Sequence, residues 1–347
     1  MPETLTVPRG SDFAPLARQV RDSGLLDRRR GYYTLSIGLN LLGTAAIWIA
    51  LAMLGDTWWQ LLLAVPAAVL SARTGFLGHD SGHRQIARTA RANRLLGLLL
   101  GNVMLGMSRG WWVDKHNRHH AHPNHVGKDP DVGAGALVWT PEQAGERRGA
   151  TAWLARHQAA LFFPMLLLEG LSLQITSVLD LRNRAGRERL VEGSLLAVHA
   201  IGYPVLAFAV LTPLQAVAFM ALHQALFGLH LGCAFAPNHK GMEMPGEEED
   251  WDHLRRQVLT SRNVRGGPVT DWLLGGLNYQ IEHHLLPGIP RPNLRRAQPL
   301  VREHCARLGL PYAETGPLDS YALALGHLRA VGEPLRRQGQ EEAVPRG

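Results

Sequence analysis

GYYTLSIGLNLLGTAAIWIALAMLGDTWWQLLLAVPAAVLSARTGFLGHDSGH, residues 31–83, is the stretch that decides the fold. Its first part, 31–55, has no charged residue and as a helix would reach about 37 Å, which exceeds a hydrocarbon core of about 30 Å. A second apolar run, 58–77, follows after a short turn and is interrupted only by Pro66 and Arg73. The stretch therefore predicts two membrane-spanning helices in a tight hairpin, followed directly by a His-x3-His pair.

A second hairpin of the same kind lies in the C-terminal half of the chain. Residues 193–211 and 214–236 are apolar and uncharged, and Thr212-Pro213 separates them. The short connections around Asp56 and Thr212-Pro213 carry no Lys or Arg, so the positive-inside rule predicts that both termini and the long central segment are cytoplasmic. The sequence thus predicts an all-α, multi-pass protein of the cell membrane, with four transmembrane helices in two hairpins.

The distribution of charge supports a membrane protein. The 347 residues include 36 Lys or Arg and 29 Asp or Glu, a formal net charge of +7, yet no basic residue lies in 31–72 or 190–239. Basic clusters flank the spans, where they can meet anionic headgroups, so the basic excess requires no nucleic acid. Two cysteines exclude a disulfide scaffold or a Cys-rich zinc module. The expected organisation is a cytoplasmic N-terminal segment, 1–30, a membrane domain, 31–305, and a cytoplasmic C-terminal segment, 306–347.

Two further apolar stretches are not expected to cross the membrane. Residues 95–107 are too few for a span, and residues 161–178 contain Pro164, Glu169 and several polar residues. We expect both to form interfacial or re-entrant helices on the cytoplasmic side.

Three histidine clusters share helical spacing. The first, 79-HDSGH-83, is an i, i+4 pair; the second, 116-HNRHH-120, and the third, 280-QIEHH-284, have i, i+3, i+4 spacing, with glutamine first in the third. Residues three and four apart share a helix face, so each cluster can direct its imidazoles at one point. Imidazole suits Fe, Zn and Cu, and seven imidazoles are too many for one tetrahedral zinc ion. The clusters therefore predict two metal ions, whereas scattered surface histidines would not repeat this spacing.

The clusters resemble the three histidine boxes of the membrane fatty acid desaturases. The Gln-x-x-His-His form of the third box is similar to the subgroup that contains front-end and related bacterial acyl desaturases. Further matches at Pro123-Asn124, 127-GKDPD-131 and 237-PNHKGM-242 extend the resemblance over roughly residues 30–305. The His-Pro-Gly-Gly motif of the fused cytochrome domain found in many front-end members is absent from this sequence. We therefore expect the electrons to come from a separate protein.

The resemblance implies a cytoplasmic helical cap that holds a di-iron centre above four spans that shelter an acyl chain. The implied iron ligands are His79, His83, His116, His119, His120, His239, His283 and His284. Whether Gln280 is a ligand or supports one stays open. Side chains that could support the ligating imidazoles are Asp80, Asn124, Asp129, Asp131, Asn238, Gln280 and Glu282.

The sequence predicts the roles of the histidines outside the three clusters less specifically. His122 and His125 lie near the second box but off its spacing, and we expect them to support the ligands or face solvent. His199, His223 and His230 fall inside predicted spans, where a polar side chain usually faces the bundle interior. They would either make hydrogen bonds between helices or line an acyl channel.

The implied function is O2-dependent desaturation of a fatty acyl chain, an oxidoreductase reaction that reduces O2 to water at two non-haem irons, with no catalytic side chain beyond the metal ligands. The implied partners are an acyl substrate carried by CoA, a carrier protein or a lipid, the bilayer itself, and an electron donor such as ferredoxin or a flavin reductase. A hydroxylase of the same fold is the nearest alternative, and a membrane metal- or haem-binding protein is the alternative from another class. The sequence leaves open the chain length, the double-bond position, the acyl carrier, the electron donor and the oligomeric state.

Overall fold

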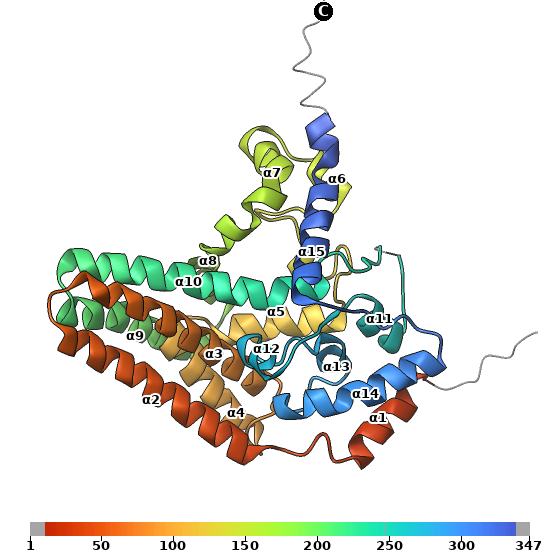
Figure 1. Cartoon of the computed structure of the whole chain (residues 1–347), viewed down its shortest axis with the longest axis horizontal. Helices are drawn as coiled ribbons and strands as arrows, with labels where there is room; N and C mark the ends of the chain where they lie inside the picture. The colour runs from red at the N-terminus through yellow and green to blue at the C-terminus, as the bar shows by residue number, and fades with distance from the viewer. Residues whose placement is uncertain (1–10, 247, 338–347) are drawn as a thin grey trace, which may run out of the picture.

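A computed structural model describes residues 11–246 and 248–337, and their regular structure is almost entirely helical (Figure 1). A two-stranded parallel sheet pairs β1 (Asn263–Val264) with β2 (Glu314–Thr315). Four segments are long and apolar enough to cross a membrane: α2 (Arg30–Leu54), η1 with α3 (Trp58–Leu63 and Ala64–Gly82), α9 (Gly186–Val210) and α10 (Pro213–His239). The predicted all-α architecture with two apolar hairpins is therefore confirmed.

The span helices continue beyond the apolar stretches that predict them. Helix α9 begins at Gly186, seven residues before the expected start, and α3 and α10 end at Gly82 and His239 instead of residues 77 and 236. Hydropathy marks the part of a helix that lipid can cover, whereas backbone hydrogen bonding extends the same helix into polar surroundings. As a result, the last turns of α3 and α10 present His79 and His239 beyond the apolar bundle.

The two short connections of the hairpins are tied together. Thr212 and Gln215 form a reciprocal capping box at the start of α10. Gln215 Nε2 also donates a hydrogen bond of 2.7 Å to Asp56 Oδ1 in the other connection. One buried apolar cluster joins all four spans and includes Ile47 and Leu51. The hairpins are thus fixed side by side.

The additional apolar stretches form short or bent helices. Helices α7 (Gly149–Leu166) and α8 (Glu169–Asp180) meet at a bend of 86°, and they count as a fifth candidate span only if taken as one broken segment. The bend packs closely on α10, because a Cβ at Gly228 would lie 2.6 Å from both Gly170 N and Leu166 O. The other stretch is a π-helix, η2 (Leu98–Leu105), that continues α4 (Ala90–Gly97) and buries Leu100 and Leu105.

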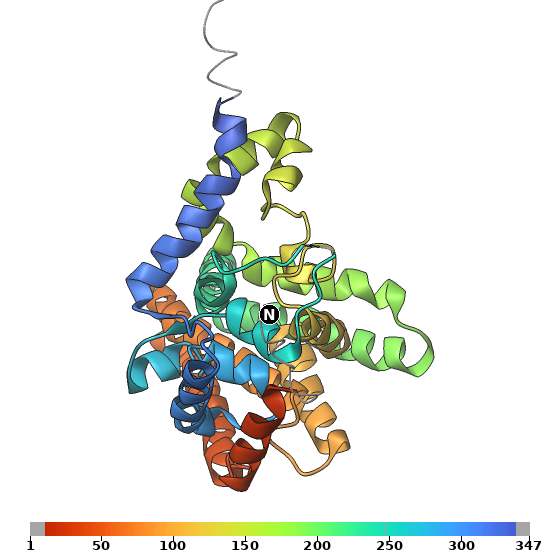
Figure 2. The same cartoon turned by 90° about the vertical axis from the view of Figure 1, so that its right-hand side faces the viewer.

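The remaining elements lie at the ends of α3 and α10, onto which Figure 2 looks, and most of them build a cap there. They are α1 (Phe13–Asp22), α5 (Arg109–Ala121), η3 (Pro130–Val132), α6 (Pro141–Gly145), η4 (Leu181–Asn183), α11 (His253–Leu259), α12 (Pro268–Leu273), α13 (Gln280–Leu285), α14 (Arg291–Arg307) and α15 (Pro317–Val331). Leu16 and Val20 of α1 are buried against α14, and Ser320 and Leu328 of α15 are also fully buried. Both terminal segments therefore contribute helices to the fold, although they flank the membrane domain in sequence.

Candidate metal centre

The three histidine boxes and His239 come from four elements that meet in the cap. His79 lies on the last turn of α3 and His83 caps that helix. The second box lies on α5, the third on α13, and His239 ends α10. Helix ends from both hairpins therefore bring histidines to the same place as the two cap helices.

The eight histidines separate into two groups, and within each group the candidate ligand atoms lie within 4.8 Å of one another. The five-histidine group consists of His79, His83, His116, His120 and His283. The three-histidine group consists of His119, His239 and His284. Both His-His pairs, 119–120 and 283–284, are split between the groups, because adjacent residues on an α-helix point about 100° apart.

Direct contacts between ring nitrogens define the five-histidine group. His116 Nε2 lies 3.0 Å from His83 Nε2 and 3.0 Å from His120 Nε2. The rings of His79 and His283 are 4.7 Å apart, centre to centre. All five imidazoles thus face one common point.

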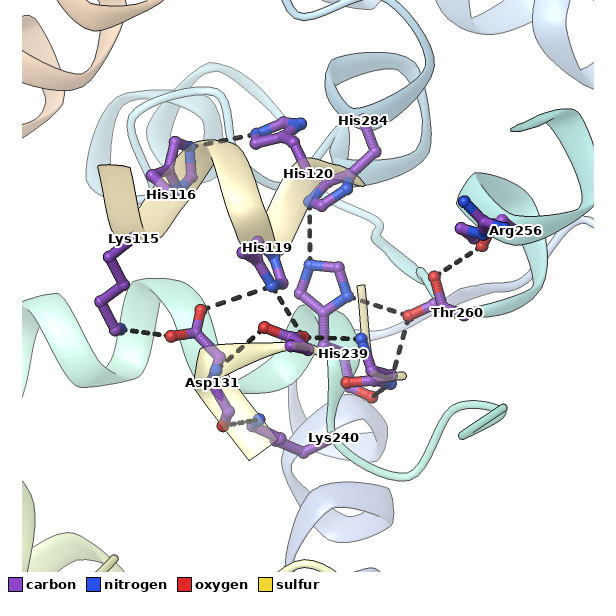
Figure 3. A network of polar contacts seen from close by, with 12 residues as sticks. Lys115, His116, His119, His120, Asp131, His239, Lys240, Arg256, Thr260 and His284 are labelled. Carbon is purple, nitrogen blue, oxygen red and sulfur yellow. Dashed lines mark hydrogen bonds and ion pairs between the residues drawn. The ribbon is translucent and has the colours of Figure 1, made fainter. Parts of the chain in front are cut away.

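The three-histidine group lies directly beside the first (Figure 3). His239 Nε2 is 3.1 Å from His284 Nε2, and the His119 ring lies 4.8 Å from the His239 ring. The rings of His120 and His284 stack at 4.2 Å, which joins the two groups. Each group could therefore hold one metal ion, and the two sites would lie side by side.

The donor atoms fit a pair of metal ions. His79 Nε2 and His283 Nε2 are buried and have no hydrogen-bond partner among the described residues, which is costly unless a ligand occupies the site. The pKa values of five histidines lie well below 6.5, first because of burial and second because of neighbouring imidazoles. Their rings are therefore neutral and can donate lone pairs to a metal at neutral pH. These histidines are His83, His116, His120, His283 and His284.

His119 differs in its electrostatics. Its Nδ1 lies 2.9 Å from Asp129 Oδ2. The same nitrogen lies 3.4 Å from Oδ2 of Asp131, which Figure 3 labels. Burial lowers the pKa of His119, but the two carboxylates outweigh it and raise the pKa overall. Lys115 pairs with Asp131 and fixes that carboxylate in turn. Such carboxylate–histidine contacts orient a ligating ring and increase its basicity.

Two candidate ligands are held by residues that no recognisable sequence pattern marks. His239 Nδ1 donates to the carbonyl oxygen of Thr260 at 2.9 Å, and His284 Nδ1 lies 3.0 Å from Gln257 Oε1. Gln257 Nε2 also donates to the backbone carbonyl of His120 at 2.9 Å. Gln257 therefore links the second and third boxes. Its role was invisible in the sequence because neither spacing nor residue type marks it.

A buried network supports His79. Asp80 Oδ1 lies 3.2 Å from His79 Nδ1, and Asp80 Oδ2 accepts a hydrogen bond of 3.0 Å from the Tyr33 hydroxyl. Arg291 Nη2 lies 2.6 Å from the same oxygen. The Asp80 carboxylate therefore contacts His79 as expected. Tyr33 of α2 and Arg291 of α14, which were not expected at the site, hold this carboxylate.

The predicted amide side chains lie at the three-histidine group. Gln280 Nε2 is 2.9 Å from His239 Nε2, and Gln280 Oε1 accepts from Asn238 Nδ2 at 3.2 Å. Asn124 lies further out: its Nδ2 donates to the His239 carbonyl at 2.9 Å, and its backbone N–H donates to Asp129 at 2.7 Å. Gln280 thus lies directly beside the Nε2 atom of His239.

Glu282 does not face the imidazoles. Its carboxylate accepts hydrogen bonds from Asn263 Nδ2 at 2.7 Å and from the Tyr312 hydroxyl at 2.6 Å. Burial raises the pKa of Glu282 above its ordinary value. Asn263 Oδ1 also accepts from Ile281 N at 2.9 Å, so this cluster holds α13 to β1. Glu282 supports the helix that carries the third box.

The remaining histidines lie outside both groups. His125 Nδ1 donates to the carbonyl of Val126 at 2.7 Å, and neither His125 nor His122 belongs to a metal-ligating group of the described chain. In the bundle, His223 bridges Ser71 and Tyr203 at 2.9 and 2.7 Å. The hydrogen-bonding interpretation of the intramembrane histidine thus holds for His223, which joins α3, α9 and α10.

Trp112 packs against the second histidine box. The indole of Trp112 stacks on the His116 ring at 4.4 Å. A Cβ at Gly82 would come within 2.6 Å of this indole, so the glycine between the histidines of the first box allows the close approach. Nothing in the sequence distinguishes Trp112 from an ordinary packing or interfacial residue.

Comparison with known proteins identifies the family of this chain. A model of the fatty acid desaturase family matches residues 56–316. The acyl-lipid (9-3)-desaturase of Physcomitrium patens is 30% identical over 344 residues, which cover 94% of this chain and 64% of that protein. The delta(6)-fatty-acid desaturase fat-3 of Caenorhabditis elegans is 29% identical over 93% of this chain and 75% of its own length. The delta(8)-fatty-acid desaturase of Euglena gracilis is 27% identical, with coverages of 96% and 81%. This chain, with its three histidine boxes, belongs to the fatty acid desaturase family.

Proposed function

We propose that the protein is an O2-dependent desaturase of fatty acyl chains that works with two non-haem irons and reduces O2 to water. The observation that carries this proposal is the convergence of eight histidines into two adjacent groups at the ends of the apolar hairpins. The names of the three relatives support a fatty acyl substrate, since each is described as a desaturase of fatty acids or acyl lipids.

The five-histidine group would hold one iron and the three-histidine group the other. When bound, such a pair of irons supplies the oxidising power that removes hydrogen from an unactivated C–H bond with O2. The chain itself keeps the imidazoles neutral and oriented: Asp129 and Asp131 hold His119, the Thr260 carbonyl holds His239, and Gln257 holds His284. His79, His283 and all three histidines of the three-histidine group are buried, which would limit the access of water to the reacting centre.

We further infer that the site and both termini face the cytoplasm of a cell membrane. The two short connections of the hairpins carry no basic residue, which favours their placement outside the cell. The electrons would then come from a cytoplasmic protein such as ferredoxin or a flavin reductase. The acyl carrier would be CoA, a carrier protein or a membrane lipid.

Expression in a host that lacks the product provides the test. Acyl chains are profiled by mass spectrometry for the wild type, His119→Ala and His157→Ala, the last an exposed control outside both groups. We expect a new double bond with the wild type and the control only, and about two irons per chain in both purified proteins. A hydroxylated acyl chain would assign the hydroxylase reaction instead. One zinc ion per chain with no O2 requirement would contradict the oxidative proposal.

A further inference from the structure

Helices α6, α7 and α15 form an arm that stands out from the bundle (Figures 1 and 2). In Figure 1, α7 and α15 run steeply across the direction of α2 and α10. The arm starts at the cap end of α10, where Lys240 Nζ lies 3.8 Å from the Trp139 ring and Tyr321 donates to the Cys233 carbonyl. Because the spans run through the membrane, an arm across their direction at the cap lies along the membrane plane.

Helix α7 lies on the side of α15 that is turned toward the far ends of the spans (Figure 1). Its inner face is buried, and Gln158 there accepts from Val138 N at 3.0 Å and donates to the Leu328 carbonyl at 3.0 Å. Its outer face is exposed and mostly apolar, and consists of Trp153, His157, Ala160, Phe163, Pro164 and Leu167. The exposed fractions of Trp153, Phe163 and Leu167 are 56%, 37% and 39%.

The outer face of α7 lacks the charges of a water-facing helix. From residue 149 to 166 the only Lys, Arg, Asp or Glu is Arg156. The apolar surface continues into α8, where Leu171, Ile175 and Val178 are each about half exposed. A helix with this composition, joined to membrane spans, matches an interfacial helix whose apolar face lies among acyl chains.

A pocket of about 400 Å³ lies at the N-terminal end of α7. Arg147, Arg148, Arg156 and Trp153 line it. Among the described residues no carboxylate lies within 4.0 Å of any of these three guanidinium groups, and Arg156 Nε is buried without a hydrogen-bond partner. Three guanidinium groups gathered in one pocket, with no carboxylate of the described chain within 4.0 Å of them, indicate an anionic ligand.

We propose that α7 lies in the membrane interface and that the arginine pocket binds the phosphate of an anionic bilayer lipid. Guanidinium groups bind phosphate oxygens in a bidentate manner, and tryptophan prefers the headgroup level of a bilayer. The apolar outer face of α7 would receive the acyl chains of the same lipid layer. Charge complementarity and continuity with the span surface both favour lipid over a soluble anion or a second copy of the chain.

Lipid binding can be measured without enzymatic activity. Purified protein in mixed micelles is titrated with phosphatidylglycerol, and the thermal midpoint gives the apparent affinity. Arg148→Gln/Arg156→Gln should bind on the order of thirtyfold more weakly than the wild type. Arg18→Gln/Arg21→Gln, an equal loss of charge on the exposed side of α1, should bind as the wild type. If both double variants bind phosphatidylglycerol with equal affinity, the arginine pocket is not the binding site and the proposal is wrong.

Two further ligands distinguish binding of a lipid phosphate from binding of a soluble anion. Phosphatidylcholine with the same acyl chains should raise the midpoint of the wild type much less than phosphatidylglycerol does. Inorganic phosphate at the same concentration should have no effect. If inorganic phosphate stabilises the wild type as strongly as phosphatidylglycerol, the pocket binds a soluble anion and the lipid proposal is wrong.

The position of α7 is tested with a fluorescent label on single cysteines in nanodiscs, in a background without Cys233 and Cys305. A label at Ala160→Cys on α7 should be quenched by doxyl-labelled lipids, as should one at Ile201→Cys, which is 64% exposed on α9. A label at Ala306→Cys, exposed on α14, should be quenched by aqueous iodide instead. Iodide quenching at Ala160→Cys, or protection from both quenchers in a particle with two chains, would refute the interfacial position.

Discussion

Arg291 and Asp80 form a buried ion pair in which Nη2 of the arginine lies 2.6 Å from Oδ2 of the carboxylate, while Oδ1 faces His79. The pair joins the start of α14 to the end of α3 and stands directly behind a candidate metal ligand. Removal of one partner of a buried ion pair leaves an unpaired charge and costs about 3–5 kcal/mol.

Arg291→Gln should therefore lower both bound metal and the thermal midpoint. Arg295→Gln removes an exposed charge one turn further along the same helix and should change neither. Metal content by mass spectrometry and the unfolding midpoint provide the measurement. Unchanged metal content in Arg291→Gln would mean that Asp80 orients His79 without the arginine.

Glu192 of α9 fixes the helix that carries the second box. Its buried carboxylate accepts hydrogen bonds from Ser108 Oγ at 2.5 Å, Gly110 N at 3.0 Å and Asn102 Nδ2 at 3.2 Å. Glu192→Ala leaves these donors unpaired, at a cost of about 1–3 kcal/mol, and should loosen α5 and weaken metal binding. Glu188→Gln, one turn earlier and more exposed, is the control and should leave metal binding intact.

His239, a member of the three-histidine group, and Gln280, which lies beside it, should differ in the effect of their removal. His239→Ala removes an imidazole that lies 3.1 Å from His284 Nε2, so it should abolish desaturation and lower bound iron. Gln280→Ala removes only the amide beside His239 and should be the milder change. Iron content and product yield are compared in both variants. Full iron and activity in His239→Ala, with both lost in His116→Ala, would assign His239 a structural role.

Labelling tests the predicted orientation. In intact cells, a membrane-impermeant thiol reagent should reach Asp56→Cys in the first short connection but not Lys128→Cys beside the second box. The native cysteines are replaced beforehand, and permeabilised cells provide the positive control for Lys128→Cys. Labelling of Lys128→Cys from outside intact cells would reverse the topology and place the histidines outside the cytoplasm.

Acid should destabilise the metal-free protein through the imidazoles whose pKa values are lowered in the folded state. The pKa values of His83, His116 and His120 are held well below 6.5 in the folded state. Between those values and about pH 6.5 the unfolded chain binds more protons, so stability falls as the pH falls. His119 has the opposite sign: its pKa is raised, so its contribution is complete below about 6.5 and is lost as the pH rises through the raised value.

The histidines with lowered pKa values outnumber His119, whose pKa is raised. The thermal midpoint of the metal-free protein should therefore decrease from about pH 7 to pH 5. His83→Gln/His116→Gln removes two of the responsible groups and should give a shallower decrease. A midpoint that is independent of pH over this range would contradict the buried, neutral state of the histidines.

The sequence by itself determined the spans and the boxes, because both depend on local properties. The length of an uncharged run decides whether a helix can cross lipid, and i, i+4 spacing decides that His79 and His83 face the same way. The aligned ends of the spans then bring His239 to the level of the boxes. The resemblance to the desaturase family rests on the same local patterns, and the eight candidate ligands are what that resemblance implies.

Only the tertiary structure decided how the ligands are divided and what holds them. His119 and His120 are neighbours in sequence, yet they point about 100° apart on α5, and the packing of α10 and α13 against that helix assigns them to different groups. Gln257, Thr260 and Arg291 reach the ligands across long sequence separations. No local rule predicts such contacts, because they depend on how whole helices pack.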